Sequence, residues 1–77
     1  MIYNYEYFSV QPLPLKKGRK TIEYEVVSNS SGARLAILKW YGPWRQYCFF
    51  PMEGTIWNRG CLNDINATIT LIMSERK

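Results

Sequence analysis

The segment that most constrains the fold comprises residues 35–51, where two runs of aliphatic and aromatic residues flank a Gly42-Pro43 pair. Such runs on either side of a turn signal are typical of a β-hairpin. If Gly42 and Pro43 are the two central turn residues, a type II′ turn results, because Gly42 accepts a positive φ and Pro43 holds a negative one. A longer loop over residues 40–44 is the alternative, and it changes the strand register.

Alternation along the strands predicts two faces for this hairpin. In the tight-turn register Trp40 pairs with Arg45, and the two form a cation–π contact. The first face carries Leu35, Ile37, Cys48 and Phe50, and turns polar at Lys39 and Gln46. The second face carries Ala36, Leu38, Trp40, Arg45, Tyr47 and Phe49. Since neither face is simply polar, either both are covered or one is an aromatic surface for a partner.

The N-terminal part predicts two further strands. Residues 2–10 alternate, with Tyr3, Tyr5 and Tyr7 on one side, and predict a first strand. Pro12 and Pro14 follow it and end it, because proline removes a backbone donor.

Residues 21–28 predict the second of these strands, followed by a turn at residues 29–32. The side chains expected to face the core are Ile22, Tyr24 and Val26. Glu23 and Glu25 then point the other way, towards solvent or a basic partner, for which Arg45 is a candidate.

After residues 55–57, which form either a short strand or a packed connector, the hydrophobic spacing changes to three and four. This spacing indicates an amphipathic helix with Asn58 as its N-cap. Its apolar stripe comprises Cys61, Leu62, Ile65, Ile69, Ile72 and Met73. Burial of this stripe outweighs the weak helix propensity of its β-branched residues.

The predicted fold is α+β: a small antiparallel sheet of three to five strands in a meander, with one C-terminal helix packed on one face. Residues 1–77 are expected to form a single domain. The predicted core comprises Ile22, Tyr24, Val26, Leu35, Ile37, Cys48, Phe50, Leu62, Ile65 and Ile69.

Composition argues against an enzyme. The chain contains no histidine, which removes the commonest general base and metal ligand. Cys48 and Cys61 are too few and too far apart for a zinc site, and no glycine-rich phosphate loop is present. We therefore expect no catalytic residue, metal, cofactor or small-molecule substrate. The chain shows no signal peptide and no apolar run that could span a bilayer, so we expect a cytoplasmic protein with reduced thiols and no membrane partner.

Two features suggest a binding function. Lys16, Lys17, Arg19 and Lys20 lie together in what must be an exposed loop, which is either simply solvated or contacts phosphates. Trp40, Trp44 and Arg45 gather near the hairpin tip. These seven residues are the candidate site.

Residues 39–51 read Lys-Trp-Tyr-Gly-Pro-Trp-Arg-Gln-Tyr-Cys-Phe-Phe-Pro, followed by Thr-Ile-Trp-Asn at 55–58 and Cys-Leu-Asn-Asp-Ile at 61–65. With these motifs the chain resembles a group of small uncharacterised proteins of bacteria, phages and mobile elements. The resemblance covers about the C-terminal half. It implies a phage or mobile-element origin and no known activity.

Two functional hypotheses remain open. The net charge of +4, the basic loop and the aromatic hairpin favour a small nucleic-acid-binding module. The alternative is a protein-interaction module, either a homodimer or an accessory protein that binds a host protein, because tryptophan, tyrosine and arginine dominate protein interfaces. The sequence favours nucleic acid over a protein partner.

Overall fold

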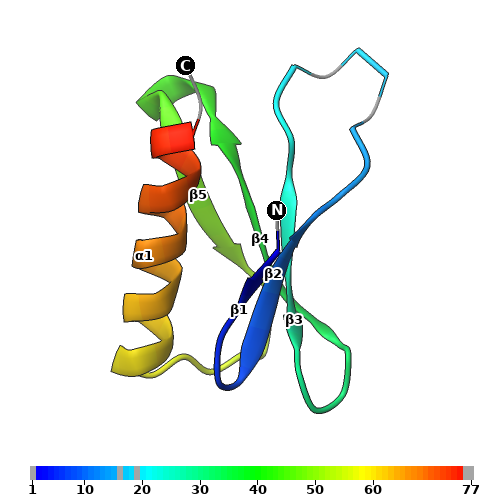
Figure 1. The fold of residues 1–77 in the computed structure, drawn as a ribbon, viewed down its shortest axis with the longest axis vertical. Helices are drawn as coiled ribbons and strands as arrows, with labels where there is room; N and C mark the ends of the chain where they lie inside the picture. Colours follow the sequence, from blue (N-terminus) through cyan, green and yellow to red (C-terminus); the bar gives the residue numbers. More distant parts are fainter. Residues whose placement is uncertain (1, 16, 19, 76–77) are drawn as a thin grey trace.

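The computed structural model describes residues 2–15, 17–18 and 20–75. Five antiparallel strands form one sheet, in which their order in space follows their order in the chain. The strands are β1 (Tyr3–Asn4), β2 (Phe8–Pro12), β3 (Tyr24–Ser28), β4 (Arg34–Tyr41) and β5 (Gln46–Pro51). The α-helix α1 (Arg59–Glu75) runs back along one face of the sheet (Figure 1). The predicted α+β meander with a C-terminal helix is confirmed.

The helix begins where the sequence predicts it. Asn58 Oδ1 accepts the backbone N–H of Cys61 at 2.8 Å, which is the expected N-cap bond. The side chains of Ile65, Thr68 and Ile72 are buried against the sheet. Leu62, expected in the core, is 46% exposed, because the buried stripe is centred on the other side of the helix.

Thr68 is a buried polar residue that the hydrophobic pattern does not reveal. Its hydroxyl donates to the carbonyl of Asp64 at 2.7 Å and bonds to the Tyr5 hydroxyl. These bonds satisfy the polar atom, so Thr68 can be buried completely without the cost of an unpaired group. A residue one turn from Ile65 and Ile72 therefore packs into the core although it is not hydrophobic.

The side of the β4–β5 hairpin that faces the helix is opposite to the one expected. Ala36 and Leu38 are fully buried, because they pair with Val26 and Tyr24, which already face the core. Leu38, Val10, Val26, Ala36 and Phe8 are the most deeply buried side chains of the sheet. The expected core residues Ile37, Cys48 and Phe50 lie half-buried on the other face.

The hairpin turn is neither of the two expected forms, because it spans residues 42–45, whereas the longer alternative ran over residues 40–44. Tyr41 pairs with Gln46 and Trp40 with Tyr47, so the tight type II′ turn does not form. A short 3-10 helix, η1 (Gly42–Trp44), makes the turn and is followed by Arg45 in the left-handed region at φ 54°. Proline favours the first turn of a helical segment, which explains how Pro43 starts η1 instead of completing a two-residue turn.

The first predicted strand is in fact a hairpin of β1 and β2. The chain reverses at residues 5–7, where the Tyr5 N–H donates to the Phe8 carbonyl at 2.9 Å. The side-chain amide of Asn29 donates to the carbonyls of Tyr5 and Glu6 at 2.8 and 3.3 Å, and so holds the turn from a distant loop. The expected strand over residues 21–28 is also shorter than predicted. It begins at Tyr24, which leaves Ile22 outside it and 40% exposed.

A β-bulge interrupts the pairing of β3 with β4. Val26 lies opposite Ala36, but Val27 lies opposite Arg34, so Leu35 is an additional residue in β4. Leu35 packs against the core. The shift returns Arg34 to the face that the helix does not cover.

Residues 55–57 form a packed connector between β5 and α1, which settles the alternative left open by the sequence. The Trp57 ring lies edge-on to Phe49 and Phe8, at centroid distances of 4.8 and 5.9 Å. Its indole N–H donates to Thr55 Oγ1 at 2.9 Å.

Two leucines of opposite burial test which face forms the core. Leu38→Ala should lower the free energy of unfolding by about 2–5 kcal/mol, because it leaves a cavity in a fully buried site. Leu62→Ala makes the same chemical change at a residue that is 46% exposed and should cost less than about 1 kcal/mol. Urea unfolding followed by tryptophan fluorescence measures both. Equal costs would contradict the assignment of the covered face.

Candidate functional site

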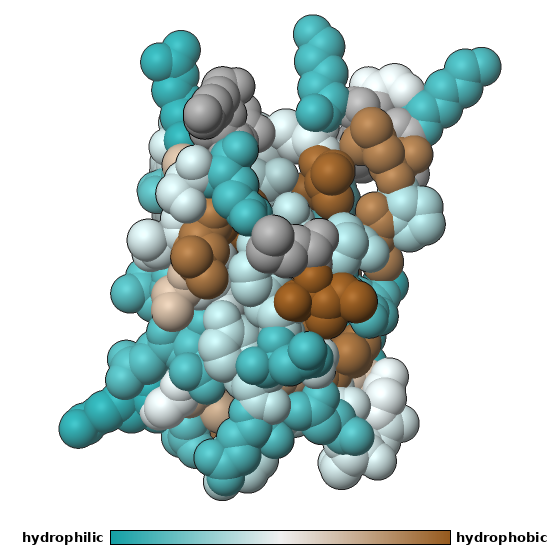
Figure 2. Space-filling model, viewed as in Figure 1, coloured by the Kyte–Doolittle hydropathy of each residue, from teal (hydrophilic) through white to brown (hydrophobic). Residues whose placement is uncertain are grey.

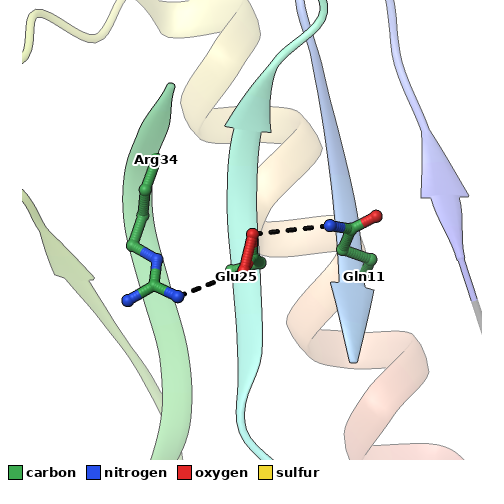
Figure 3. Close-up of polar contacts among 3 residues, drawn as sticks. All are labelled: Gln11, Glu25 and Arg34. Carbon is green, nitrogen blue, oxygen red and sulfur yellow. Dashed lines mark hydrogen bonds and ion pairs between the residues drawn. The ribbon is translucent and has the colours of Figure 1, made fainter. Parts of the chain in front are cut away.

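The face of the sheet opposite the helix carries the candidate site, and we call it the open face. Alternation along the paired strands assigns its side chains. They are Asn4, Ser9, Gln11, Glu25, Val27, Arg34, Ile37, Lys39, Tyr41, Gln46, Cys48 and Phe50. Figure 3 looks onto part of this face and shows the helix behind the strands. The open face is polar over β1–β3 and becomes aromatic over β4 and β5.

The charge of the open face is positive. Glu25 is the single acidic residue within the five strands. One of its carboxylate oxygens lies 3.1 Å from the Arg34 guanidinium, and the other accepts a long 3.4 Å bond from the Gln11 amide (Figure 3). The partner of Glu25 is therefore Arg34. The sequence had suggested Arg45 instead. With Glu25 neutralised, Lys39 remains as a cation on this face.

Aromatic rings gather at the tip of the β4–β5 hairpin. The Tyr41 ring meets Trp44 edge-on at a centroid distance of 5.1 Å and Phe50 at 6.4 Å. Lys39 Nζ lies 4.7 Å from the centre of the Phe50 ring. The rings border a depression of about 270 Å³, which we call the aromatic hollow, and Trp44 is 66% exposed beside it. Its lining residues are Tyr41, Trp44, Cys48, Phe49 and Phe50.

Four of the predicted site residues lie in two loops of the structure. Trp44 and the exposed Arg45 lie in the hairpin loop, and the exposed Lys17 and Lys20 lie in the β2–β3 connection. In a meander these two loops lie at the same end of the sheet (Figure 1). Long hydrophilic side chains project from this end of the molecule (Figure 2).

The other three predicted site residues are Lys16, Arg19 and Trp40. Lys16 and Arg19 lie outside the described residues. Trp40 is on the helix-covered face, where it packs against the core and meets Tyr47 edge-on at 5.9 Å. The expected pairing of Trp40 with Arg45 is replaced by the pairing with Tyr47.

Lys39, Tyr41 and Phe50 also belong to this surface, although the sequence did not predict them as site residues. The sequence contained one indication of this surface. Lys39 and Gln46 are polar residues that interrupt the apolar alternation on one face of the hairpin, which indicates contact with water.

Cys48 and Cys61 are both free thiols. Among the described residues, no three histidine, cysteine or acidic side chains come together to hold a metal ion. Within the same residues, no helix has the length and apolarity needed to cross a membrane.

A second depression lies at the other end of the sheet. It measures about 470 Å³ and is lined by the β1–β2 turn, the β3–β4 turn and the connector before α1. Tyr7, Leu35, Trp57 and Cys61 are among its lining residues. Ile56 also lines it and is 96% exposed.

Comparison with curated proteins finds a relative of similar length. It is an "Uncharacterized 9.3 kDa protein" of Acholeplasma phage L2, which is 37% identical over 60 residues. The match covers 78% of this chain and 77% of the relative. No protein-family model and no solved structure matches the chain.

The tyrosines near the end of α1 have altered acidities. The Tyr3 hydroxyl donates to the Glu75 carboxylate at 2.8 Å. Burial and this hydrogen bond raise the pKa of Tyr3 to about 12, because ionisation would place a second negative charge beside Glu75. Burial also raises the pKa of Tyr24.

These shifts predict a loss of stability at alkaline pH. The folded chain keeps the Tyr3 proton at pH values where the unfolded chain has released it. The contribution is therefore complete below pH 10 and is lost as the pH rises towards about 12. Denaturant unfolding between pH 9 and 12 should show a steeper decline for the wild type than for Tyr3→Phe. Parallel declines would contradict a buried, hydrogen-bonded Tyr3.

Proposed function

The chain belongs to the same family as the small phage L2 protein, and we propose that it binds nucleic acid through the open face and the two loops at the hairpin end. The observation that carries this proposal is the separation of charge. The one carboxylate of the strands is paired with Arg34, and Lys39 and Arg45 flank an exposed aromatic cluster.

The remaining described acidic residues lie away from the strands of the open face. Glu6 belongs to the β1–β2 turn and Glu53 to the segment after β5, while Asp64 and Glu75 are on the helix. Glu23 lies in the β2–β3 connection. Glu23 and Glu75 lie at the same end of the sheet as the hairpin loop but not on the strands. The cations that a polyanion would meet on the open face and in the hairpin loop are Lys39 and Arg45.

Cations and rings at this end suit the two parts of nucleic-acid binding. Lysine and arginine side chains that replace condensed counterions supply affinity without sequence preference. Exposed aromatic rings can stack on bases. Lys17 and Lys20 extend the basic surface beyond the sheet, since both are exposed in the neighbouring loop.

We further propose that the protein acts by binding alone, without a cofactor, and in the cytoplasm. Its two free thiols would stay reduced there.

Titration with labelled oligonucleotides at several salt concentrations tests the proposal. The logarithm of the association constant should fall linearly with the logarithm of the salt concentration. Arg45→Asn should make that slope shallower by roughly 0.7–0.9, the value for one lost phosphate contact. Asparagine is chosen because Arg45 has a positive φ, which alanine tolerates poorly.

Arg59→Asn is the matched control, because Arg59 is exposed at the start of α1, at the other end of the sheet. It should leave the slope unchanged. An affinity that does not depend on salt, or no binding at low salt, would overturn the proposal.

Self-association is the second candidate function, favoured by the exposed Ile56 beside the depression at the opposite end. A branched apolar side chain that is 96% exposed is unfavourably hydrated. Its burial against a second copy of the chain would therefore lower the free energy.

Sedimentation over a range of protein concentrations tests this candidate. The wild type should associate as its concentration rises, and Ile56→Asp should remain monomeric, because it would place a charge in the contact. A wild type that is monomeric at every concentration would exclude self-association through this end.

A further inference from the structure

We infer that the aromatic hollow receives one unpaired nucleobase, so that the favoured ligand is single-stranded nucleic acid. The inference rests on the proposed function and names the substrate class of the same surface. It assigns a role to Tyr41, Trp44 and Phe50, which form the exposed side of the hairpin.

The arrangement of the rings leaves a ring face available. Tyr41 stands at 84° to Trp44 and at 64° to Phe50, so these rings meet edge to face and do not stack flat on one another. Trp44 keeps 66% of its surface exposed although it contacts Tyr41. Such rings can form the walls of a site in which a planar group lies against the face of Trp44.

The size of the hollow fits a small planar group. At about 270 Å³ it is smaller than the roughly 300–1,000 Å³ typical of sites for whole cofactors or drug-sized molecules. It is also open, because it lies on the surface of the sheet next to a loop. A single base attached to a chain can enter such a site while its backbone stays outside.

The charges around the hollow match a phosphodiester chain. Lys39 Nζ lies over the Phe50 ring, and Arg45 directly follows Trp44. The nearest acidic residue of the sheet, Glu25, is already paired with Arg34. A purely apolar partner would make no use of these cations, whereas a nucleotide presents a ring for the hollow and phosphates for Lys39 and Arg45.

The requirement for a ring face separates single strands from duplexes. Inside a duplex each base is covered on both faces by its neighbours, so an aromatic side chain cannot stack on it without opening the helix. In a single strand the bases can turn outward and stack on aromatic rings, largely regardless of sequence. The hollow should therefore strengthen binding to single strands and contribute little to duplex binding.

The test compares Trp44→Ala with the wild type, using a fluorescently labelled oligothymidine and a labelled duplex, followed by anisotropy. Trp44 is mostly exposed in a loop, so its removal should leave the fold intact. Single-strand affinity should fall about tenfold or more, the loss expected for one stacked base, and duplex affinity should change less than twofold. Trp44→Phe should recover part of the loss, because it restores a ring.

Tyr7→Ala is the matched control. Tyr7 is 63% exposed, close to the 66% of Trp44, but it lies in the β1–β2 turn at the opposite end of the sheet. It should bind both oligonucleotides as the wild type does.

Other outcomes overturn the inference. If Trp44→Ala binds the single strand normally, or loses both ligands equally, the hollow is not a site for an unpaired base. Salt-dependent binding by the wild type would still support the proposed function in that case. If the wild type binds neither oligonucleotide at low salt, the proposed function fails, and the base site fails with it.

Discussion

The packing of one helix on one side of a five-stranded sheet is the constraint on which the other features depend. Ile65 and Ile72 share one buried core with Ala36 and Val26 of the sheet, and Thr68 is fully buried beside them on the helix. Within the described part of the chain, no second α-helix covers the other face. That face must therefore remain in contact with water or with a partner, and its mixed apolar and basic character follows from this position.

Local chemistry explains the parts of the fold that the sequence predicts correctly. The hairpin over β4 and β5, the turn after β3 and the helix with its Asn58 cap all depend on residues close together in the chain. Alternation also separates the hairpin into the two faces that the structure contains, apart from Leu35 at the bulge and Arg45 in the loop. A meander then follows from short connections between neighbouring strands.

The parts that could not be predicted depend on contacts between distant residues. Whether Leu38 or Ile37 faces the helix is decided by the register between β3 and β4, and a shift of one residue exchanges the two faces. The turn at residues 5–7 is held by Asn29, which lies 24 residues from Tyr5. Thr68 can be buried in the core because its hydroxyl forms hydrogen bonds with the Tyr5 hydroxyl and with a helix carbonyl.

The site was predictable to a similar degree. Trp44 and Arg45 could be placed at the hairpin tip because a turn lies between them and the preceding strand. Lys39, Tyr41 and Phe50 could not be assigned to an uncovered surface until the covered face was known. Hydrophobicity alone favoured the face of Ile37, Cys48 and Phe50 as the core. Lys39 and Gln46 on the same face already indicated contact with solvent.

The bulge at Leu35 determines whether Glu25 has an ion-pair partner on the open face. With regular pairing Arg34 would lie opposite Ser28, and its side chain would project towards the helix side. Glu25 would then stand in the middle of the open face as an uncompensated negative charge, with only a long bond from Gln11. One inserted residue thus supplies the cation that neutralises Glu25, so the charge of this face depends on the spacing of the strand as much as on the identity of its residues.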